Sequence, residues 1–251
     1  MVYFVGAGCG AADLITVRGK RLLEQADVII YAGSLVNAEL LQSAKSGCSI
    51  HNSAVMTLDE IIAVMQDAEA KGLLTVRLHT GDPCVYGAIR EQMDRLDALH
   101  IPYEICPGVS AFCGAAAALR AEYTLPDVSQ TVILTRMAGR TPVPAAESIE
   151  SLASHHATMV IFLSAGMLEQ LSGQLLAGGY APDTPAAIVY KASWEDELVL
   201  RCTVSTLAET GKRHGIRKHA LITVGDFLGS DYALSKLYDA QFETEFRKAK
   251  P

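Results

Sequence analysis

Three segments of the sequence combine glycine or proline with polar side chains, and each accompanies the end of a short hydrophobic run. They are Gly6–Ala11, Arg77–Gly87 and Cys106–Ala111. Ligands of open parallel sheets bind beyond the carboxyl ends of the strands. Glycine lets a backbone approach a ligand because it carries no Cβ. The pattern therefore predicts a small-molecule site built from three loops.

The first segment formally fits G-x-G-x-x-G/A, the dinucleotide-binding fingerprint, which is a weak signal by itself. A nicotinamide site also needs an acidic residue at the end of the second strand, to bind a ribose hydroxyl. The second hydrophobic run ends in Tyr31-Ala32-Gly33, and the nearby acid, Asp27, stands at its start. A nicotinamide-dependent oxidoreductase is therefore the weaker alternative.

The second and third segments each offer a polar side chain with two interpretations. Gly81-Asp82-Pro83 is typical of a tight turn. Asp82 either accepts hydrogen bonds from a ligand or braces that turn, and it is our main candidate for a catalytic role. Ser110 either binds a ligand or caps the helix that follows.

Residue sets for other common chemistries are missing from the sequence. It shows no Ser-His-Asp or paired-carboxylate pattern, and its six cysteines form no C-x-x-C pair. His155, His156, His214 and His219 lack the spacing of a zinc site. We therefore expect no metal.

Alternating β-branched runs and helical patterns predict an α/β fold with mostly parallel or mixed sheets. Strands are expected in the first half at Val2–Gly6, Asp27–Tyr31, Leu74–His79 and Tyr103–Cys106. Helices are expected there at Thr16–Gln25, Thr57–Lys71 and Ser110–Glu122. The second of these begins with Thr57-x-x-Glu60, a capping-box pattern.

A second α/β series follows a linker near residue 123. Its expected strands are Val128–Met137, Met159–Ser164, Ala186–Tyr190, Glu197–Val204 and Ala220–Gly225. Its expected helices are Ala146–His155, Met167–Leu176, Thr206–His214 and a last one from Tyr232 to about Lys248. The sequence thus predicts two α/β lobes, residues 1–120 and 121–251.

Charge and composition exclude several classes of protein. The chain has 21 basic and 28 acidic residues, for a net charge of −7, which argues against a nucleic-acid-binding protein. The start shows no signal-peptide pattern, and the weakly polar run Ile105–Leu119 is too short to span a membrane. We expect a cytoplasmic protein with no membrane partner.

Several strings together resemble one family, the tetrapyrrole (class III) methyltransferases. The general ones are Val5–Gly10, Ala26–Tyr31, Gly81–Gly87 and Pro107–Ser110. Four others resemble the precorrin-4 and cobalt-precorrin-4 C11-methyltransferase branch: Tyr31–Val36, Thr124–Arg136, Gly139–Pro144 and Thr158–Ala165. The resemblance runs from about residue 2 to residue 228. The family commonly has Gly-Pro-Gly-Asp where this sequence has Gly8-Cys9-Gly10-Ala11.

The resemblance implies a homodimer that binds S-adenosylmethionine in a cleft between the two lobes and releases S-adenosylhomocysteine. Carried over by position, the cofactor contacts would be Cys9, Thr80, Gly81, Asp82, Val85, Ser110, Ala111, Leu163 and Ala192. A tetrapyrrole with many carboxylates favours arginine partners. The expected substrate contacts are Arg136, Arg140, Tyr86 and His79, with surface solvation or packing as the competing interpretation of each.

The implied reaction is methylation of C11 of the ring in cobalamin biosynthesis. That carbon becomes quaternary, so no general base is required. Alternatives within the family are uroporphyrinogen III or another corrin carbon as methyl acceptor. A protein or RNA acceptor and a non-catalytic binding module are further alternatives. The shared strings leave open whether the substrate carries cobalt.

Overall fold

The computed structural model describes residues 1–249, which divide into two compact units. Unit 1 contains Met1–Ala118 together with Lys191–Leu198, and unit 2 contains Leu119–Tyr190 and residues 199–249. The sequence placed the boundary after residue 120 and assigned everything beyond it to the second lobe. The main difference is Lys191–Leu198, a segment from the second half of the chain that packs with the first.

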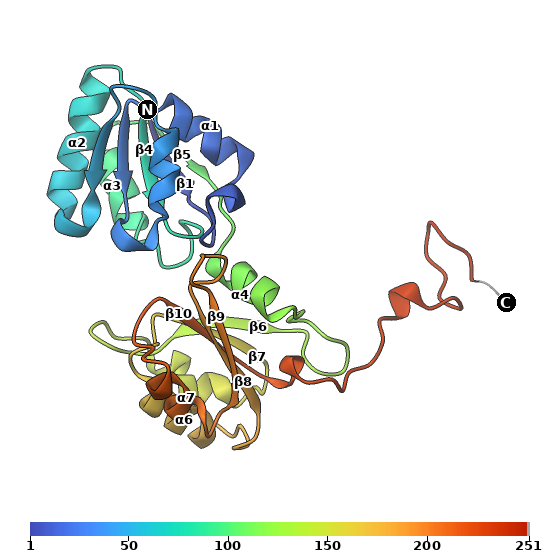
Figure 1. Ribbon diagram of the computed structural model, residues 1–251. Helices are drawn as coiled ribbons and strands as arrows, with labels where there is room; N and C mark the ends of the chain where they lie inside the picture. The colour runs from blue at the N-terminus through green and yellow to red at the C-terminus, as the bar shows by residue number, and fades with distance from the viewer. Residues whose placement is uncertain (250–251) are drawn as a thin grey trace. The chain divides into compact units, whose positions relative to one another are not determined.

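Unit 1 is built on a five-stranded parallel sheet (Figure 1). Its strands, in the spatial order β3-β2-β4-β1-β5, are β1 (Val2–Gly6), β2 (Val28–Tyr31), β3 (Ser49–Asn52), β4 (Thr75–His79) and β5 (Tyr103–Cys106). The four strands expected in this half are present. The edge strand β3 was not expected, because three of its four residues are exposed and it has no hydrophobic run to reveal it.

Helices cover both faces of this sheet (Figure 1). They are α1 (Val17–Gln25), α2 (Leu58–Ala70) and α3 (Arg90–Ala98). A fourth helix, α4 (Ala111–Leu119), follows the loop after β5. Side chains alternate along β1, so Phe4 joins the core beneath α2 and α3, whereas Val5 joins the core beneath α1. The sequence missed α3 because it is mostly charged and buries only Gln92 and Leu96.

Unit 2 holds a five-stranded mixed sheet. Its strands, in the order β6-β7-β10-β8-β9, are β6 (Val132–Arg136), β7 (Thr158–Phe162), β8 (Pro185–Tyr190), β9 (Leu198–Thr203) and β10 (Ala220–Val224). Strand β10 runs antiparallel to both neighbours, while β6 and β7 are parallel. Its α-helices are α5 (Ile149–Ala153), α6 (Leu168–Ala177) and α7 (Leu207–Arg213). The prediction of two α/β lobes is confirmed.

Short 3-10 helices connect many of these elements. They are η1 (Ala12–Leu14), η2 (Gly33–Leu35), η3 (Ala38–Ser43), η4 (Ser53–Val55), η5 (Ala145–Glu147), η6 (Asp226–Leu228) and η7 (Lys236–Tyr238).

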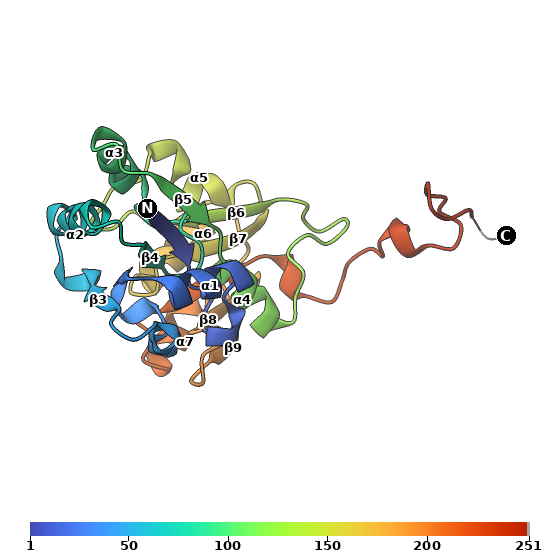
Figure 2. The ribbon, with the colours of Figure 1, turned by 90° about the horizontal axis from the view of Figure 1, so that it is seen from above.

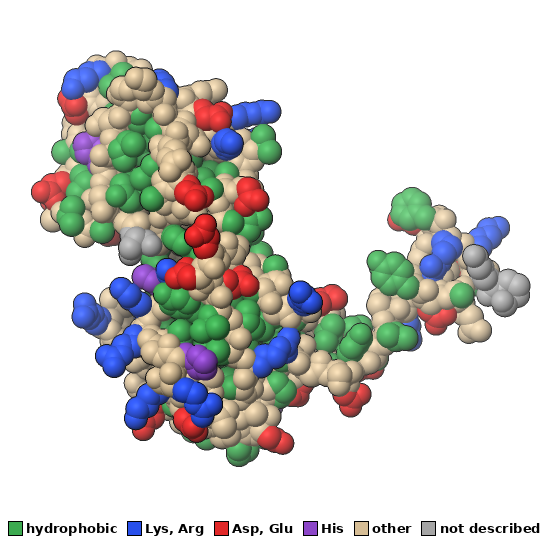
Figure 3. Space-filling view, in the orientation of Figure 1, with side chains coloured by type: hydrophobic (Ala, Val, Ile, Leu, Met, Phe, Trp, Pro, Cys, Tyr) green, Lys and Arg blue, Asp and Glu red, His purple; other side chains and the backbone are tan. Residues whose placement is uncertain are grey.

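The expected C-terminal α-helix is wrong. Residues 232–249 contain the single turn η7 and otherwise irregular backbone (Figure 2). Leu234, Tyr238 and Phe246 are exposed, and Figure 3 shows hydrophobic side chains on the surface of this segment. A short helix gains most of its stability from burying an apolar face, and here none is buried. Arg247 instead donates to backbone carbonyls of the segment.

Among the described residues, none of the helices has the length and apolar character needed to cross a bilayer.

The capping box at the start of α2 gives a stability prediction. The Thr57 Oγ1 accepts from the Glu60 N–H at 3.3 Å, and the Glu60 Oε2 accepts from the Thr57 N–H at 2.7 Å. Thr57→Ala removes the first bond and should lower the free energy of unfolding by about 1 kcal/mol in urea titration. Glu60→Gln keeps an acceptor at that position and should cost less than half as much. Equal losses of unfolding free energy for the two variants would contradict the assignment of a capping box.

Candidate functional site

The three expected ligand loops follow three adjacent strands. Gly6–Ala11 follows β1, Thr80–Gly87 follows β4, and Pro107–Ala111 follows β5, and β1 lies between β4 and β5. Since all three strands are parallel, their carboxyl ends lie at the same edge of the sheet. The loops therefore meet in unit 1.

Backbone hydrogen bonds join the first and second loops. Gly8 and Gly81 form an antiparallel bridge, in which the Gly81 N–H donates to the Gly8 oxygen at 2.9 Å and the Gly8 N–H donates to the Gly81 oxygen at 3.2 Å. Both glycines have positive φ, 84° and 61°. These are left-handed conformations that glycine adopts without steric cost.

The third loop packs against the other two through glycine backbone. A Cβ on Gly6 would lie 2.5 Å from the Gly108 Cα and from the Gly81 oxygen. A Cβ on Gly108 would overlap that same oxygen. No residue with a side chain fits at Gly6 or Gly108 without moving the loops apart.

Asp82 links the second loop to the third. Its Oδ1 accepts from the Cys84 N–H and its Oδ2 from the Gly108 N–H, both at 2.8 Å. Partial burial by itself would raise the pKa of this carboxyl, but the hydrogen bonds from Cys84 and Gly108 outweigh burial and lower its pKa. Both oxygens are used within the protein, so the geometry favours the bracing interpretation over direct catalysis.

Residues that follow β8 in the second half of the chain pack against the first loop. The Ala11 N–H donates to the Ser193 Oγ at 3.0 Å, and the Cys9 Sγ lies 3.7 Å from the same oxygen. A Cβ on Gly10 would overlap the Ala192 oxygen. The structure thus places Cys9 and Ala192 together. The sequence analysis did not identify Ser193. This residue is far from the glycine loop in the sequence, and only the fold brings the two together.

Thr80, Ser110 and Ala111 lie at the same junction. The Ala111 nitrogen would be 3.3 Å from a Cβ on Gly81, and Ser110 is buried immediately before α4. The Thr80 Oγ1 is buried and has no hydrogen-bond partner among residues 1–249. Burying an unpaired hydroxyl is costly, so this atom has the geometry of one that a bound ligand satisfies.

The rest of the second loop is strained and partly exposed. After Val85, which is half-buried, come Tyr86 and Ala88 with φ values of 58° and 49°. Tyr86 is 45% exposed. The expected substrate contact His79 is only 3% exposed, and burial together with the Arg77 charge lowers its pKa to about 3. Its burial does not support direct contact with a substrate.

Three expected site residues belong to unit 2. Leu163 directly follows β7 with a φ of 53° and is 65% exposed, an uncommon combination for a bulky apolar residue. The Arg136 guanidinium donates to the carbonyls of Met137, Thr141 and Pro142 and so holds its own loop. Arg140 is exposed and has no hydrogen bond or ion pair within the described part of the chain.

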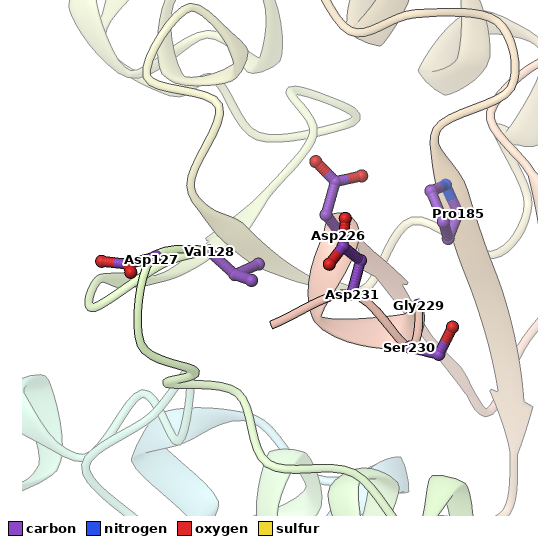
Figure 4. A pocket seen from close by; sticks show the side chains of 7 residues that line it. All are labelled: Asp127, Val128, Pro185, Asp226, Gly229, Ser230 and Asp231. Atoms are coloured by element: carbon purple, nitrogen blue, oxygen red, sulfur yellow. The ribbon is translucent and has the colours of Figure 1, made fainter. Parts of the chain in front are cut away.

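Unit 2 also has a shallow hollow of about 350 Å³ that the sequence did not indicate. Asp127, Asp226 and Asp231 line it, and Figure 4 shows the Asp127 carboxylate pointing away from the other two. Its negative charge makes it a poor site for an anionic ligand. Over residues 1–249, no group of three or more His, Cys, Asp or Glu side chains could hold a metal ion.

Known proteins of one family are similar to this chain along most of its length. The sequence profile described as Tetrapyrrole (Corrin/Porphyrin) Methylases matches residues 1–208. The cobalt-precorrin-4 C(11)-methyltransferase of Methanocaldococcus jannaschii is 53% identical over 99% of this chain and 96% of its own. The precorrin-4 C(11)-methyltransferase of Mycobacterium tuberculosis is 47% identical over 92% of each.

Solved structures give the same result. A cobalt precorrin-4 methyltransferase described as a cobalamin biosynthetic enzyme superposes with a TM-score of 0.89 at 46% identity, covering 91% of this chain and 96% of its own. A Thermus thermophilus uroporphyrin-III C-methyl transferase complexed with S-adenyl homocysteine gives 0.75 at 25% identity, covering 90% and 92%. The fold, the loops and the profile match lead to one conclusion: the chain belongs to the tetrapyrrole (corrin/porphyrin) methylase family.

Proposed function

We propose that this protein transfers the methyl group of S-adenosylmethionine to C11 of precorrin-4 or cobalt-precorrin-4, giving the corresponding precorrin-5 in cobalamin biosynthesis. The observation that carries the proposal is the 53% identity to a cobalt-precorrin-4 C(11)-methyltransferase over 99% of this chain. Relatives named for the cobalt-containing and for the cobalt-free substrate are both similar to it, so the proposal includes both.

The joined loops of unit 1 fit a nucleoside-containing cofactor. The glycines at 8, 81 and 108 let the three loops approach closely, and the buried Thr80 hydroxyl lacks a partner among the described residues. The residues that would hold the cofactor in this unit are Cys9, Thr80, Gly81, Asp82, Val85, Ser110, Ala111 and Ala192. Leu163 is a further proposed cofactor contact. When bound, S-adenosylmethionine supplies an electrophilic methyl group.

The residues of this site suit a reaction that depends on positioning. Methylation at a carbon that becomes quaternary releases no proton there, so the site needs no general base. Orienting two bound partners can lower a barrier by roughly 7–11 kcal/mol. Asp82 would contribute by fixing two loops, because both its oxygens accept backbone N–H groups. This is a positioning role and replaces the catalytic role expected from the sequence.

The substrate's carboxylates require cationic partners. Arg140 is exposed, while the Arg136 guanidinium is already hydrogen-bonded to three carbonyls of its own loop. Arg140 is therefore the better candidate for binding a carboxylate, and Tyr86 the better candidate for contact with the ring. We further propose that the protein acts as a homodimer.

The first prediction concerns the reaction itself. Methyl-labelled S-adenosylmethionine should transfer one label to precorrin-4 or cobalt-precorrin-4, with a mass gain of one methyl group, and NMR should place it at C11. Uroporphyrinogen III should receive no label. Transfer to uroporphyrinogen III instead would select the alternative acceptor. If the protein binds S-adenosylhomocysteine but transfers no methyl group to any of these acceptors, the result would favour a non-catalytic binding module.

A second prediction concerns Asp82. Asp82→Asn replaces one acceptor oxygen by a donor that faces a backbone N–H, so one of the two bonds must break. Calorimetry should show S-adenosylhomocysteine binding weakened about tenfold or more. Asp67→Asn, an exposed change on α2, is the matched control and should leave affinity unchanged.

The pH dependence of the wild-type protein follows from the lowered pKa of Asp82. A carboxyl whose folded pKa is depressed stabilises the folded state above its unfolded pKa, about 3.9. That stabilisation is lost only as the pH falls through the lower folded value. Affinity for S-adenosylhomocysteine should therefore show no Asp82 titration between about pH 5 and 8. A loss of affinity centred near pH 6 that Asp82→Asn abolishes would contradict this assignment.

A third prediction tests the unpartnered hydroxyl of Thr80. Thr80→Val keeps the shape and removes a buried hydroxyl that has no partner in the ligand-free structure. Affinity for S-adenosylhomocysteine should fall about fivefold or more, while the ligand-free protein unfolds at the same or a higher temperature. Thr75→Val removes a similarly unpartnered buried hydroxyl at the other end of β4, and should leave affinity unchanged. Equal effects of the two variants on affinity would show that Thr80 makes no ligand contact.

A further inference from the structure

A buried arginine interrupts the apolar core between β4 and α3. Val76 and Leu78 of β4 point into the core beneath α1, so Arg77 lies on the opposite face. Arg77 is 5% exposed and Gln92 of α3 is 4% exposed. The Arg77 Nε donates to the Gln92 Oε1 at 3.0 Å, and its Nη1 donates to the Ile30 oxygen of β2 at 3.2 Å.

Nothing in this arrangement neutralises the charge. Arg77 forms no ion pair with any residue that the structure describes, and its hydrogen-bond partners are a neutral amide and a carbonyl. Burial of an unpaired charge costs stability, and apolar side chains of similar volume often pack such a space more favourably. The arginine therefore needs an explanation other than packing.

Gln92 connects Arg77 to the second ligand loop by hydrogen bonds. Its Nε2 donates to the Ala88 oxygen at 3.0 Å. Arginine can only donate and a carbonyl can only accept, so the side chain between them must offer one acceptor and one donor. A glutamine amide does this, and its orientation is fixed by the two partners. Glutamate has the same shape but offers two acceptors.

The segment held in this way is strained. Tyr86 and Ala88 have φ values of 58° and 49°, in the left-handed region that side chains disfavour. Between them, Gly87 lies so close to the Pro83 carbonyl that a Cβ would overlap it. Such conformations persist only where the surroundings fix them. The Gln92 amide is a side-chain contact at the end of this segment.

We propose that Gln92, oriented by Arg77, is a positioning residue that holds Tyr86–Ala88 in its strained conformation for contact with the tetrapyrrole. The inference rests on the proposed function, because it takes the exposed Tyr86 as a substrate contact. Gln92 itself is buried and touches no substrate. Its loss affects binding of the ring more than binding of the cofactor. Gly81 and Asp82 are held by Gly8 and Gly108, and among the proposed cofactor contacts only Val85 adjoins the segment.

The test uses Gln92→Glu, which keeps the acceptor for Arg77 and removes the donor to Ala88. The KM for the tetrapyrrole should rise about tenfold, while kcat and the Kd for S-adenosylhomocysteine stay within about twofold. Hydrogen exchange of the peptide spanning residues 83–90 should become faster. Gln66→Glu, the same chemical change at an exposed position of α2, is the matched control and should alter none of these values.

A double variant separates positioning from general destabilisation. Ala88→Gly removes the steric penalty of the left-handed conformation. In Gln92→Glu with Ala88→Gly, the rise in KM should therefore shrink to less than about threefold. This comparison also covers the case in which Gln92→Glu lowers the unfolding temperature, because Ala88→Gly cannot restore packing in the core.

The outcomes distinguish the inference from the proposed function. Wild-type protein that transfers no methyl to the tetrapyrrole overturns both. Normal wild-type transfer with an unchanged KM in Gln92→Glu overturns the inference alone. So does a Kd for S-adenosylhomocysteine that weakens in parallel with KM, or a rise in KM that Ala88→Gly leaves untouched.

Discussion

Contact between backbone segments at Gly6, Gly81 and Gly108 is the constraint on which the candidate site depends. A Cβ on Gly6 would lie 2.5 Å from backbone atoms of both other loops. With that space empty, the Gly8–Gly81 bridge can form and the Asp82 carboxylate can reach the Gly108 N–H. The loops after three strands are thereby held together by backbone contacts. Most of the residues proposed to bind the cofactor lie in or beside these joined loops.

The polar residues near these loops form hydrogen bonds that hold the backbone in place, which is consistent with the proposed chemistry. Asp82 accepts two backbone N–H groups, and Gln92 joins Arg77 to the Ala88 carbonyl. Neither arrangement creates a nucleophile or a base with a pKa near neutrality, and His79 is held far from that range by burial. A methyl transfer that needs orientation more than proton transfer is consistent with such residues.

Some of the residues with unfavourable backbone conformations lie near the proposed ligand contacts. Among the described non-glycine residues with positive φ, Tyr86, Ala88, Leu163 and Ser193 lie in or next to such a contact, whereas others, such as His100 and His156, do not. Backbone strain of this kind is commonly retained at functional sites, where surrounding contacts determine the conformation. Two contacts restrain the Tyr86–Ala88 segment. Gly87 packs closely against the Pro83 carbonyl, and the Gln92 amide donates to the Ala88 oxygen.

Local patterns in the sequence determined most of the elements, because hydrophobic period, caps and turn residues act over a few residues. The capping box at Thr57 and Glu60 and the three loops after strands are examples. The same reasoning failed for elements whose residues are mostly exposed or polar, because such elements show no hydrophobic pattern. It missed β3 and α3, and it predicted a C-terminal helix whose apolar residues find no partner.

Tertiary structure alone decided how the site is assembled. The strand order β4-β1-β5 puts the three loops side by side, and only the fold brings Ser193 to Ala11 across 182 positions of sequence. It also showed that Asp82 braces the loops and that His79 is buried. These properties depend on which distant groups a side chain meets. Spacing along the chain carries no information about such contacts, because they are set by the packing of whole elements.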